Sequence, residues 1–385
     1  MRKNNNKIQK RSKLYIDVKK YNWENYNWLL AIIVFVICCF GIVCIHCADS
    51  SFTGKQILGL IMGTILMIGF SCIDYHKICN WYWAIYGILN LLLVLVLVVG
   101  KEVNGSRRWV DLKIFTFQPS EFAKVLIILF VATYVDVHRK EIDGVFMWIK
   151  LLLFCCVPII LIVTEPDLST TIDFICILAA IVFVGGISLK FIRNVLIIII
   201  PVMGLAFWYI QTPGQKLLKP YQLTRVMTFL HPQNYVDSSG YQQNNSIMAI
   251  GSGRLLGKGL FSSSVSDVKG SSTGLISEQQ TDFIFSVVGE SLGFVGSVIV
   301  IAFLALIVLQ CILVARKARD ISGKLIATGM AALVCFQSFI NIGVATALLP
   351  NTGLPLPFLS YGLTSLVSNM IGIGVVLNIS LQRRR

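Results

Sequence analysis

Charged residues are scarce in this chain. Only 14% of its 385 residues are Asp, Glu, Lys or Arg, whereas 56% are hydrophobic, and the mean hydropathy is +0.76. Soluble domains carry about 25% charged residues, so this composition argues against a soluble enzyme and indicates a polytopic membrane protein. Because helices satisfy their own backbone hydrogen bonds in lipid, we expect an all-α fold.

Patterns that hold metals or disulfides are scarce as well. The four His residues show no metal-ligand spacing, and no Asp-x-Asp sequence occurs, which disfavours a nucleotide-sugar donor. Cys44-Ile-His-Cys47 lies within an apolar run, where we interpret a single CxxC as packing rather than a metal site. The long polar loop contains no Cys, so no disulfide framework is expected there.

Long apolar runs, in contrast, recur along the chain. Each is about 18 or more residues long, which is enough to cross a bilayer. About ten such runs occur, at 28–48, 56–73, 80–100, 119–137, 147–165, 168–187, 190–210, 282–314, 323–348 and 357–380. The run at 282–314 is longer than one span requires, so we expect it to tilt or protrude.

Basic residues outnumber acidic ones by 33 to 19 and gather in particular loops. Residues 1–27 form a basic arm without an apolar core or a cleavage site, so they are not expected to be a signal peptide. The positive-inside rule places this arm, the tail 381–385 and three short basic loops in the cytoplasm. A single membrane domain at 28–380 is therefore expected in the cell membrane, with both termini cytoplasmic. No basic soluble domain is present to bind nucleic acid, and we expect the arm to attract anionic membrane lipids instead.

Two loops on the predicted outer face are also basic. The short loop 101–118 contains Arg107 and Arg108, and the large extracytoplasmic loop, about 211–281, contains Arg225. Long loops cross a membrane regardless of charge, but short ones do so less readily. Guanidinium groups this close to a membrane edge favour an anionic ligand, with phosphate the natural candidate. Snorkelling to lipid headgroups is the alternative.

Ionisable residues also lie within the predicted spans. Gln118-Pro-Ser-Glu121-Phe-Ala-Lys124 is typical of a helix start, with Glu121 and Lys124 three apart on one face. This pair could fix helix packing or line a substrate cavity, and the spacing does not choose between the two. Thr164-Glu-Pro-Asp167 predicts a sharp outer turn, in which Asp167 or Ser169 could cap the next helix. Asp173 is expected to face the interior of the bundle.

Asp282 stands where the long polar loop meets a predicted membrane helix. A carboxylate costs about 3 kcal/mol at the centre of a membrane helix and less near the interface, so one placed here is expected to act on a ligand. If the helix begins early enough, Glu278 and Asp282 share one face, about one turn apart. Two neighbouring acids raise one pKa, which suits a proton acceptor near neutral pH. Helix capping is the structural alternative.

The segment 349–362 contains three prolines and two glycines at the start of the last apolar run. A broken segment at membrane depth is tolerated only where it is buried in protein or lines a cavity. We therefore expect 349–362 to form a wall of the site.

These motifs occur together in one known family. In chain order they read N-G-S-R-R-W-V, F-Q-P-S-E-F-A-K, E-P-D-L, G-Y-Q-Q, A-I-G-S-G, G-K-G, E-Q-Q-T-D-F-I-F-S-V-V-G-E, F-I-N-I-G and L-P-N-T-G-L-P-L-P-F-L-S-Y-G. Over about residues 28–380 the chain resembles the SEDS family, the shape, elongation, division and sporulation proteins that include RodA, FtsW and SpoVE. The resemblance implies a ten-helix fold and a peptidoglycan glycosyltransferase that polymerises lipid II, working alongside a class B penicillin-binding protein. It also implies that the family's essential aspartate is Asp282.

The expected reaction is an inverting hexosyl transfer. Asp282 is expected to be the general base, supported by Glu278. The residues expected to bind the substrate are Arg107, Arg108, Gln118, Ser120, Glu121, Lys124, Asp167, Arg225, Tyr241, Gln242, Lys258, Gln280, Thr281, Pro357, Ser360 and Tyr361. No cofactor is required by the motifs, but Mg²⁺ or Mn²⁺ could bridge Asp282 and the diphosphate of the substrate.

The chain departs from the family pattern at Asn245, Arg254, Ser277, Ser291 and Leu363-Thr364. They indicate a divergent paralogue and keep open a scaffold that binds its penicillin-binding partner without polymerising glycan. A lipid II flippase is the other alternative, although the acidic residues cluster in the outer half of the membrane. The motifs do not distinguish elongation, division and sporulation.

Overall fold

A computed structural model describes residues 23–103, 106–111, 116–142, 144–165, 167–212, 215, 220–231, 233, 240–260 and 278–382. Ten of its helices are at least 18 residues long: α1 (Trp28–Ala48), α2 (Thr53–Cys72), α4 (Tyr82–Val99), α5 (Pro119–Val137), α6 (Val145–Thr164), α7 (Leu168–Gly185), α8 (Leu189–Ile210), α12 (Ile284–Lys317), α13 (Ile321–Ala345) and α14 (Leu363–Leu381). Shorter helices are η2 (Trp23–Asn25), η3 (Ser50–Phe52), α3 (Tyr75–Cys79), η4 (Arg139–Glu141), α9 (Pro220–Leu230) and α10 (Tyr241–Ser252).

The long helices match the ten expected spans. In the described part of the chain, nine are long and apolar enough to cross a membrane. The tenth, α5, carries Glu121, Lys124 and Asp136 and is correspondingly more polar. The expected all-α polytopic fold is confirmed, and the chain is a multi-pass membrane protein.

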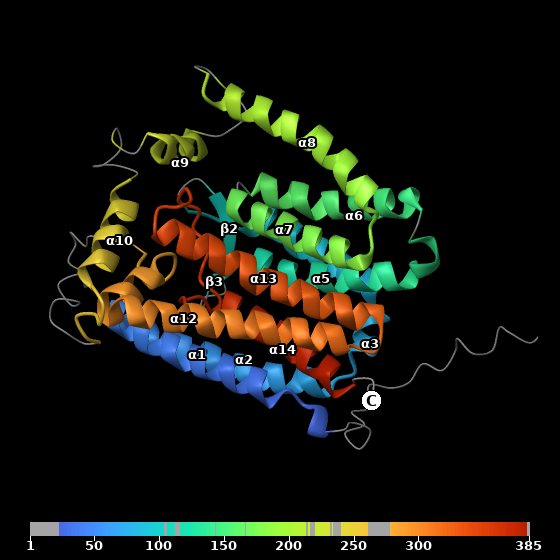
Figure 1. Cartoon of the computed structure of the whole chain (residues 1–385), viewed down its shortest axis with the longest axis horizontal. Helices are drawn as coiled ribbons and strands as arrows, with labels where there is room; N and C mark the ends of the chain where they lie inside the picture. The colour runs from blue at the N-terminus through green and yellow to red at the C-terminus, as the bar shows by residue number, and fades with distance from the viewer. Residues whose placement is uncertain are drawn as a thin grey trace, which may run out of the picture.

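The centre of the bundle is α14, whose residues are almost all buried. It packs along α2, where Gly63 lies against Met370 and Gly374 lies against the backbone of Met67. Small residues permit such close approach of helices in membranes, where no hydrophobic force draws them together. Helices α5 and α13 are also mostly buried, and α13 contacts α5, α7 and α12 (Figure 1).

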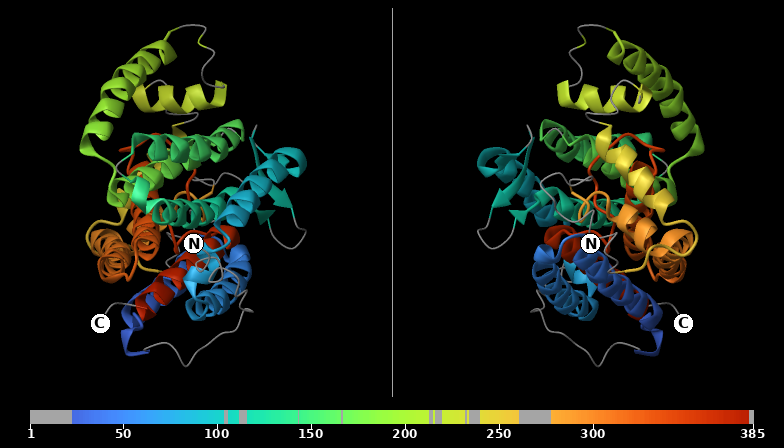
Figure 2. Two further views of the ribbon diagram at one scale, coloured as in Figure 1. Left: turned by 90° about the vertical axis from the view of Figure 1, so that its right-hand side faces the viewer. Right: turned by 90° about the vertical axis from the view of Figure 1, so that its left-hand side faces the viewer.

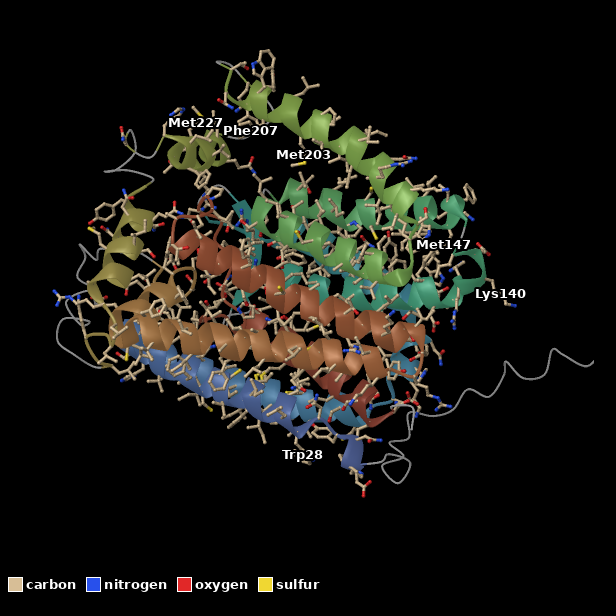
Figure 3. All side chains as sticks on the ribbon, viewed as in Figure 1. Trp28, Lys140, Met147, Met203, Phe207 and Met227 are labelled. Atoms are coloured by element: carbon tan, nitrogen blue, oxygen red, sulfur yellow. The ribbon has the colours of Figure 1, made fainter. Side chains whose placement is uncertain are left out.

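Helix α8 stands apart from this bundle. None of its residues is buried, and both side views place it away from α6 and α7, with α9 beneath its end (Figure 2). Phe191 and Ile192 in its first turn pack against the core, but most of its later apolar side chains are exposed, Met203 and Phe207 by 65% and 49% (Figure 3). Capping by Ser188, whose hydroxyl accepts from Phe191 N, starts the helix beside the end of α7.

The helix bundle has two ends, which we call the sheet end and the basic end. The sheet end carries α9, α10 and three short antiparallel strands, β1 (Lys101–Val103), β2 (Ser106–Asp111) and β3 (Thr116–Phe117), in the order β1-β2-β3. The basic end carries η4 and the α12–α13 connection, and Lys140 and Trp28 both lie there (Figure 3). Neither the strands nor the two loop helices were predicted from the sequence, because the segments lack regular apolar periodicity.

Helix α12 is broken at Gly293, whose backbone has φ 64° and ψ −158°. The loop after α10 supplies the backbone partners that the break leaves open. Phe294 N donates to Arg254 O over 2.8 Å, and Lys258 N donates to Glu290 O over 2.9 Å. Glycine is required at Gly257, because a Cβ there would lie 2.2 Å from Ser291 O and its φ is +80°. The long predicted run at 282–314 is therefore one helix with a clamped kink.

Candidate active site

Asp282 lies in a turn that precedes α12, at the sheet end. Residues 278–283 form turns rather than helix, and Asp282 N donates to Glu278 O over 3.1 Å. The shared helix face of Glu278 and Asp282 was expected only if the helix began early enough, and it does not, because α12 begins at Ile284. Glu278 has φ +65°, and its side chain is exposed.

The proline-rich segment 349–362 packs directly against this turn. Tyr361 N donates to Gln280 O over 2.7 Å, and Ser360 Oγ donates to Thr281 O over 2.5 Å. Gly353 lies closest to the reactive group, since a Cβ on it would be only 3.1 Å from Asp282 Oδ2, and its φ is +76°. The segment thus forms a wall beside the Asp282 carboxylate.

Asp282 is surrounded by a set of charged groups. Its carboxylate interacts electrostatically with Glu278, Arg225, Arg108 and Asp167. Burial and the negative charge of Glu278 raise the pKa of Asp282 to about 6, although the two guanidinium groups oppose the shift. A carboxylate with this pKa is ionised at neutral pH and takes up a proton more readily than an ordinary aspartate.

The two guanidinium groups reach the site from different loops. Arg108 belongs to β2, is 9% exposed, and its Nε lies 3.6 Å from Asp167 Oδ2. Arg225 belongs to α9, and its Nη1 donates to Thr352 O over 3.3 Å. Asp167 also caps α7 by accepting from Thr170 N over 3.0 Å, so its capping and site roles coexist.

Glu165 is an unexpected member of this group. It follows α6, is fully buried, and neither carboxylate oxygen has a hydrogen-bond partner among the described residues. Burial, reinforced by the charge of Asp167 and opposed by Arg108, raises its pKa to about 9. Glu165 is therefore neutral at physiological pH and retains a proton that it can donate.

A buried ionic network lies beneath the site, within the span of α5. Lys124 Nζ is 2.7 Å from Glu121 Oε1, 3.6 Å from Asp173 Oδ2 and 3.0 Å from Gln337 Oε1. Gln337 in turn donates from Nε2 to Pro355 O over 2.9 Å. The predicted pair is thus part of a buried triad with Asp173 that Gln337 links to the wall segment, and its expected role in lining a substrate cavity stays a prediction.

The remaining predicted residues are distributed around the wall segment. Gln118 donates from Nε2 to the buried Ser120 hydroxyl over 3.2 Å, and its backbone N donates to Thr364 Oγ1. Gln242 accepts from Asn351 Nδ2 over 3.3 Å, whereas Tyr241, at the start of α10, is 39% exposed. Pro357 is buried. Arg107 lies in β2, but its side chain is outside the described residues.

Lys258, which was expected to bind the substrate, forms an ion pair with a residue of α12. Its Nζ lies 2.7 Å from Glu290 Oε1, at the kink of α12. The ammonium charge is therefore committed to holding the loop after α10 onto α12. We retain Arg108 and Arg225, rather than Lys258, as the cations that face Asp282.

Three polar residues at the wall were missed in the sequence. Gln56 of α2 donates to Ser360 O over 3.2 Å and accepts from Gly362 N over 3.3 Å. Gln337 and Asn341 of α13 are four apart and hold the wall from the other side. An amide pair at this spacing in an otherwise apolar span was the available signal, since polar side chains in membranes rarely face lipid.

The chain is similar in sequence and in fold to known proteins. The family model described as "Cell cycle protein", for FtsW, RodA and SpoVE, matches residues 26–385. "Probable peptidoglycan glycosyltransferase FtsW" of Geobacter sp. (strain M18) is 30% identical over 378 residues, covering 94% of this chain and 98% of the relative. "Peptidoglycan glycosyltransferase MrdB" of Escherichia coli (strain K12) is 32% identical over 338 residues, 87% of each chain. A solved structure described as "Structural coordination of polymerization and crosslinking by a peptidoglycan synthase complex" superposes with a TM-score of 0.79 and 29% identity, covering 94% of this chain and 100% of the other. The chain therefore belongs to the FtsW, RodA and SpoVE family, the SEDS proteins that its motifs resemble.

Proposed function

We propose that this chain is a peptidoglycan glycosyltransferase that polymerises lipid II, with Asp282 as the general base. The observation that carries the proposal is the Asp282 carboxylate, whose pKa is raised to about 6 while two guanidinium groups face it. The names of the relatives from Geobacter and Escherichia support the same activity. A base and neighbouring cations are the two requirements of a transfer from a diphosphate-linked sugar.

In the proposed reaction, a sugar hydroxyl of the acceptor attacks the anomeric carbon of the donor. A new glycosidic C–O bond forms, and the bond to the diphosphate breaks and leaves its electron pair on the diphosphate oxygen. The hydroxyl proton passes to Asp282. General base catalysis of this kind contributes on the order of 10²–10⁴ in rate. Attack from the face opposite the leaving group inverts the configuration.

Arg108 and Arg225 are the proposed partners of the leaving diphosphate. Guanidinium forks bind phosphate oxygens with two parallel hydrogen bonds, and the attraction grows as negative charge develops on the leaving group. Glu165 lies beside Arg108 and retains its proton at neutral pH. We assign to it no chemical step, because neither of its carboxyl oxygens contacts another group of the site through a hydrogen bond among the described residues.

A metal site made by protein alone does not fit the described residues, because no group of three or more His, Cys, Asp or Glu side chains there could hold a metal ion. Mg²⁺ or Mn²⁺, if required, would have to be held jointly by Asp282 and the diphosphate oxygens, which are the hard ligands such ions prefer. Activity measured with EDTA and with added Mg²⁺ or Mn²⁺ tests this requirement.

The sheet end is proposed to face the outside of the cell, where lipid II is polymerised, and both termini to be cytoplasmic. The support is the concentration of Lys and Arg in the short loops of the basic end. We further propose a class B penicillin-binding protein as the partner. The structure of similar fold is described as a synthase complex that coordinates polymerization and crosslinking.

The deciding experiment uses the full chain purified with its penicillin-binding partner and labelled lipid II, with the transpeptidase of the partner blocked. Wild type is expected to form glycan polymer and Asp282→Asn none. The control is Glu141→Gln, which removes an exposed carboxylate of η4 at the basic end. Equal polymer from wild type and Asp282→Asn would contradict the assigned base. No polymer from any folded complex would favour a scaffold, and lipid II flipping that persists in Asp282→Asn would favour a flippase.

A further inference from the structure

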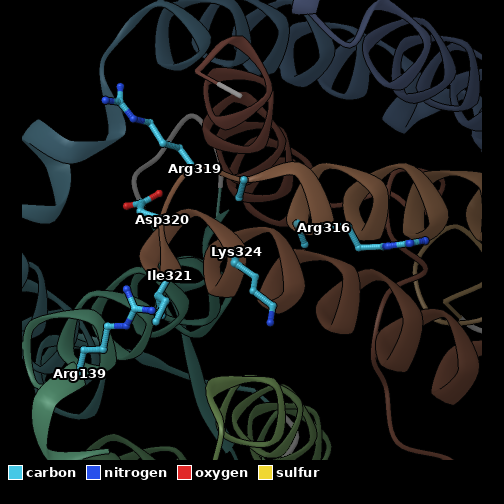
Figure 4. A pocket seen from close by; sticks show the side chains of 8 residues that line it. Arg139, Arg316, Arg319, Asp320, Ile321 and Lys324 are labelled. Atoms are coloured by element: carbon cyan, nitrogen blue, oxygen red, sulfur yellow. The ribbon is translucent and has the colours of Figure 1, made fainter. Parts of the chain in front are cut away.

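A cavity with several charged residues in its lining lies at the basic end, far from Asp282. Its volume is about 380 Å³, and it is lined by Arg139 of η4, the end of α12, the α12–α13 connection and the start of α13 (Figure 4). Asp282 precedes the first turn of α12, whereas Arg316 lies in its last turn. The 34 residues of α12 rise about 50 Å at 1.5 Å per residue, so the cavity is separate from the candidate active site.

Four cations and one carboxylate line this cavity. The cations are Arg139, Arg316, Arg319 and Lys324, and the acid is Asp320. The Asp320 carboxylate already has hydrogen-bond and ion-pair partners. The hydroxyls of Tyr75 and Ser322 donate to it, and His76 Nε2 lies 3.4 Å from its Oδ2.

The pKa of Asp320 agrees with these contacts. Hydrogen bonds from His76, Ser322 and Tyr75 outweigh burial, which acts in the opposite direction, and hold the pKa of Asp320 well below its usual range. The carboxylates of Asp320 and Asp74 raise the pKa of His76 to about 9, so His76 is charged at neutral pH. Asp320 is therefore occupied by Tyr75 and His76 of α3 and by Ser322 of α13, and is a poor partner for the four cations.

The four cations are not paired elsewhere in the described chain. The ion pairs found there involve His76, Arg108, Lys124 and Lys258 only. Arg139 also interacts with Asp136 at longer range. The close view shows the four side chains spread around the opening, with Arg139 directed toward Ile321 and Arg316 and Arg319 extending to either side (Figure 4). Such an open arrangement suits an anion at the rim rather than a deeply enclosed one.

The location of the cavity at the ends of two membrane-spanning helices indicates which kind of anion it could bind. Arg316 ends one membrane span and Lys324 lies in the first turn of the next, so both cations lie at the depth of the lipid headgroups. Ala315, Ala318 and Ile321 add an apolar part to the lining. Basic pockets between membrane helices bind anionic headgroups, and guanidinium groups match the geometry of phosphate. We propose that this cavity binds a phosphate group, supplied by the headgroup of an anionic phospholipid.

Native mass spectrometry of the full chain tests the proposal. The chain is titrated with phosphatidylglycerol or with phosphatidylcholine of the same acyl chains, and retained lipid is counted. Wild type should retain phosphatidylglycerol in preference, and Arg316→Gln/Arg319→Gln should weaken that binding on the order of twentyfold, since each cation near a membrane surface contributes about fivefold. The matched control is Lys190→Gln/Arg193→Gln, which removes the same charge from the start of α8, outside the cavity.

Equal phosphatidylglycerol binding by wild type and both double variants would overturn the proposal, and so would equal loss in both variants, which indicates a general effect of charge. Arg139→Gln, on a different element, repeats the test if the double variant does not fold. Inorganic phosphate distinguishes the two sources of the ligand. Phosphate that displaces the lipid only at high concentration supports a headgroup site, whereas tight phosphate binding without lipid preference overturns the lipid assignment.

Discussion

The side chain of Asn341 holds the backbone of Asp282. Its Nδ2 donates to Asp282 O over 2.8 Å and also to Leu354 O over 2.7 Å, so one buried amide joins the turn that carries the base to the wall beside it. Gln337, one turn earlier on α13, joins the same wall to Lys124. The position of the Asp282 carboxylate therefore depends on buried side chains of α13.

Replacing this amide should impair catalysis. Asn341→Leu leaves two buried carbonyls without a donor, which costs about 1–3 kcal/mol for each, and allows the Asp282 turn to move. Misplacement of about 1 Å can lower a rate roughly 100-fold, so we expect glycan polymerisation to fall by that order. Ser338→Ala on the same helix is the control, because the Ser338 hydroxyl is buried without a hydrogen-bond partner in the described chain. Equal loss in both variants would contradict a positioning role for Asn341.

Polymerisation should depend on pH through Asp282. The base must be ionised, and its pKa is about 6, so kcat/KM should fall roughly tenfold for each pH unit below about 6. Glu278→Gln removes a negative charge that raises this pKa, so the acid limb should move to lower pH. Glu141→Gln, an exposed acid at the basic end, should leave it in place. An acid limb that does not move in Glu278→Gln would contradict the coupling.

The same pKa predicts the stability of the Asp282→Asn variant. A carboxyl whose folded pKa is raised above its usual value of 3.8 binds its proton more tightly in the folded state than in the unfolded one. Its contribution to stability is therefore lost as pH rises from about 4 to about 6. Asp282→Asn should match or exceed the wild-type Tm at pH 7, and the gap should close near pH 4. Thermal unfolding in detergent at the two pH values measures this, and a lower Tm at pH 7 would contradict it.

Removing Lys124 should destabilise the bundle. Lys124→Met leaves Glu121 and Asp173 as buried acids without their cation, and breaking a buried pair in this way costs about 3–5 kcal/mol. The triple variant Lys124→Met/Glu121→Gln/Asp173→Asn removes the unpaired charges and should recover most of the lost Tm. Thermal unfolding of the three proteins provides the measurement. A triple variant no more stable than Lys124→Met would show that charge is not the cause.

The clamped kink of α12 should tolerate no side chain at Gly257. An alanine Cβ there would meet Ser291 O at 2.2 Å with φ at +80°, so Gly257→Ala should lower the Tm. Gly204 of α8 is the matched control, because nothing lies within 4 Å of a Cβ at that position. Gly204→Ala should leave the Tm unchanged or raise it, since alanine is favoured over glycine in a helix by about 1 kcal/mol. Similar Tm values for the two variants would contradict the clamp.

The positions of the spans follow from local sequence. Runs of apolar residues long enough to cross a bilayer are a property of each segment alone, and all ten were located within a few residues of the observed helices. The motifs around Asp282 and at 349–362 were also readable, because a carboxylate or a run of prolines is rare at membrane depth and is retained only for a reason.

Tertiary structure alone decided which of these residues meet. The contact of Asn341 with Asp282 spans 59 residues, and that of Gln56 with Ser360 spans 304, so no local pattern specifies either. Residues 278–283 form turns, although a helix that included Glu278 was considered from the sequence. Lys258, which was expected to bind the substrate, forms an ion pair with Glu290 near the kink at Gly293. Apolar periodicity determines that a segment enters the membrane. The partners of its few polar groups are determined by packing, because each buried donor must find whichever acceptor the folded bundle brings within reach.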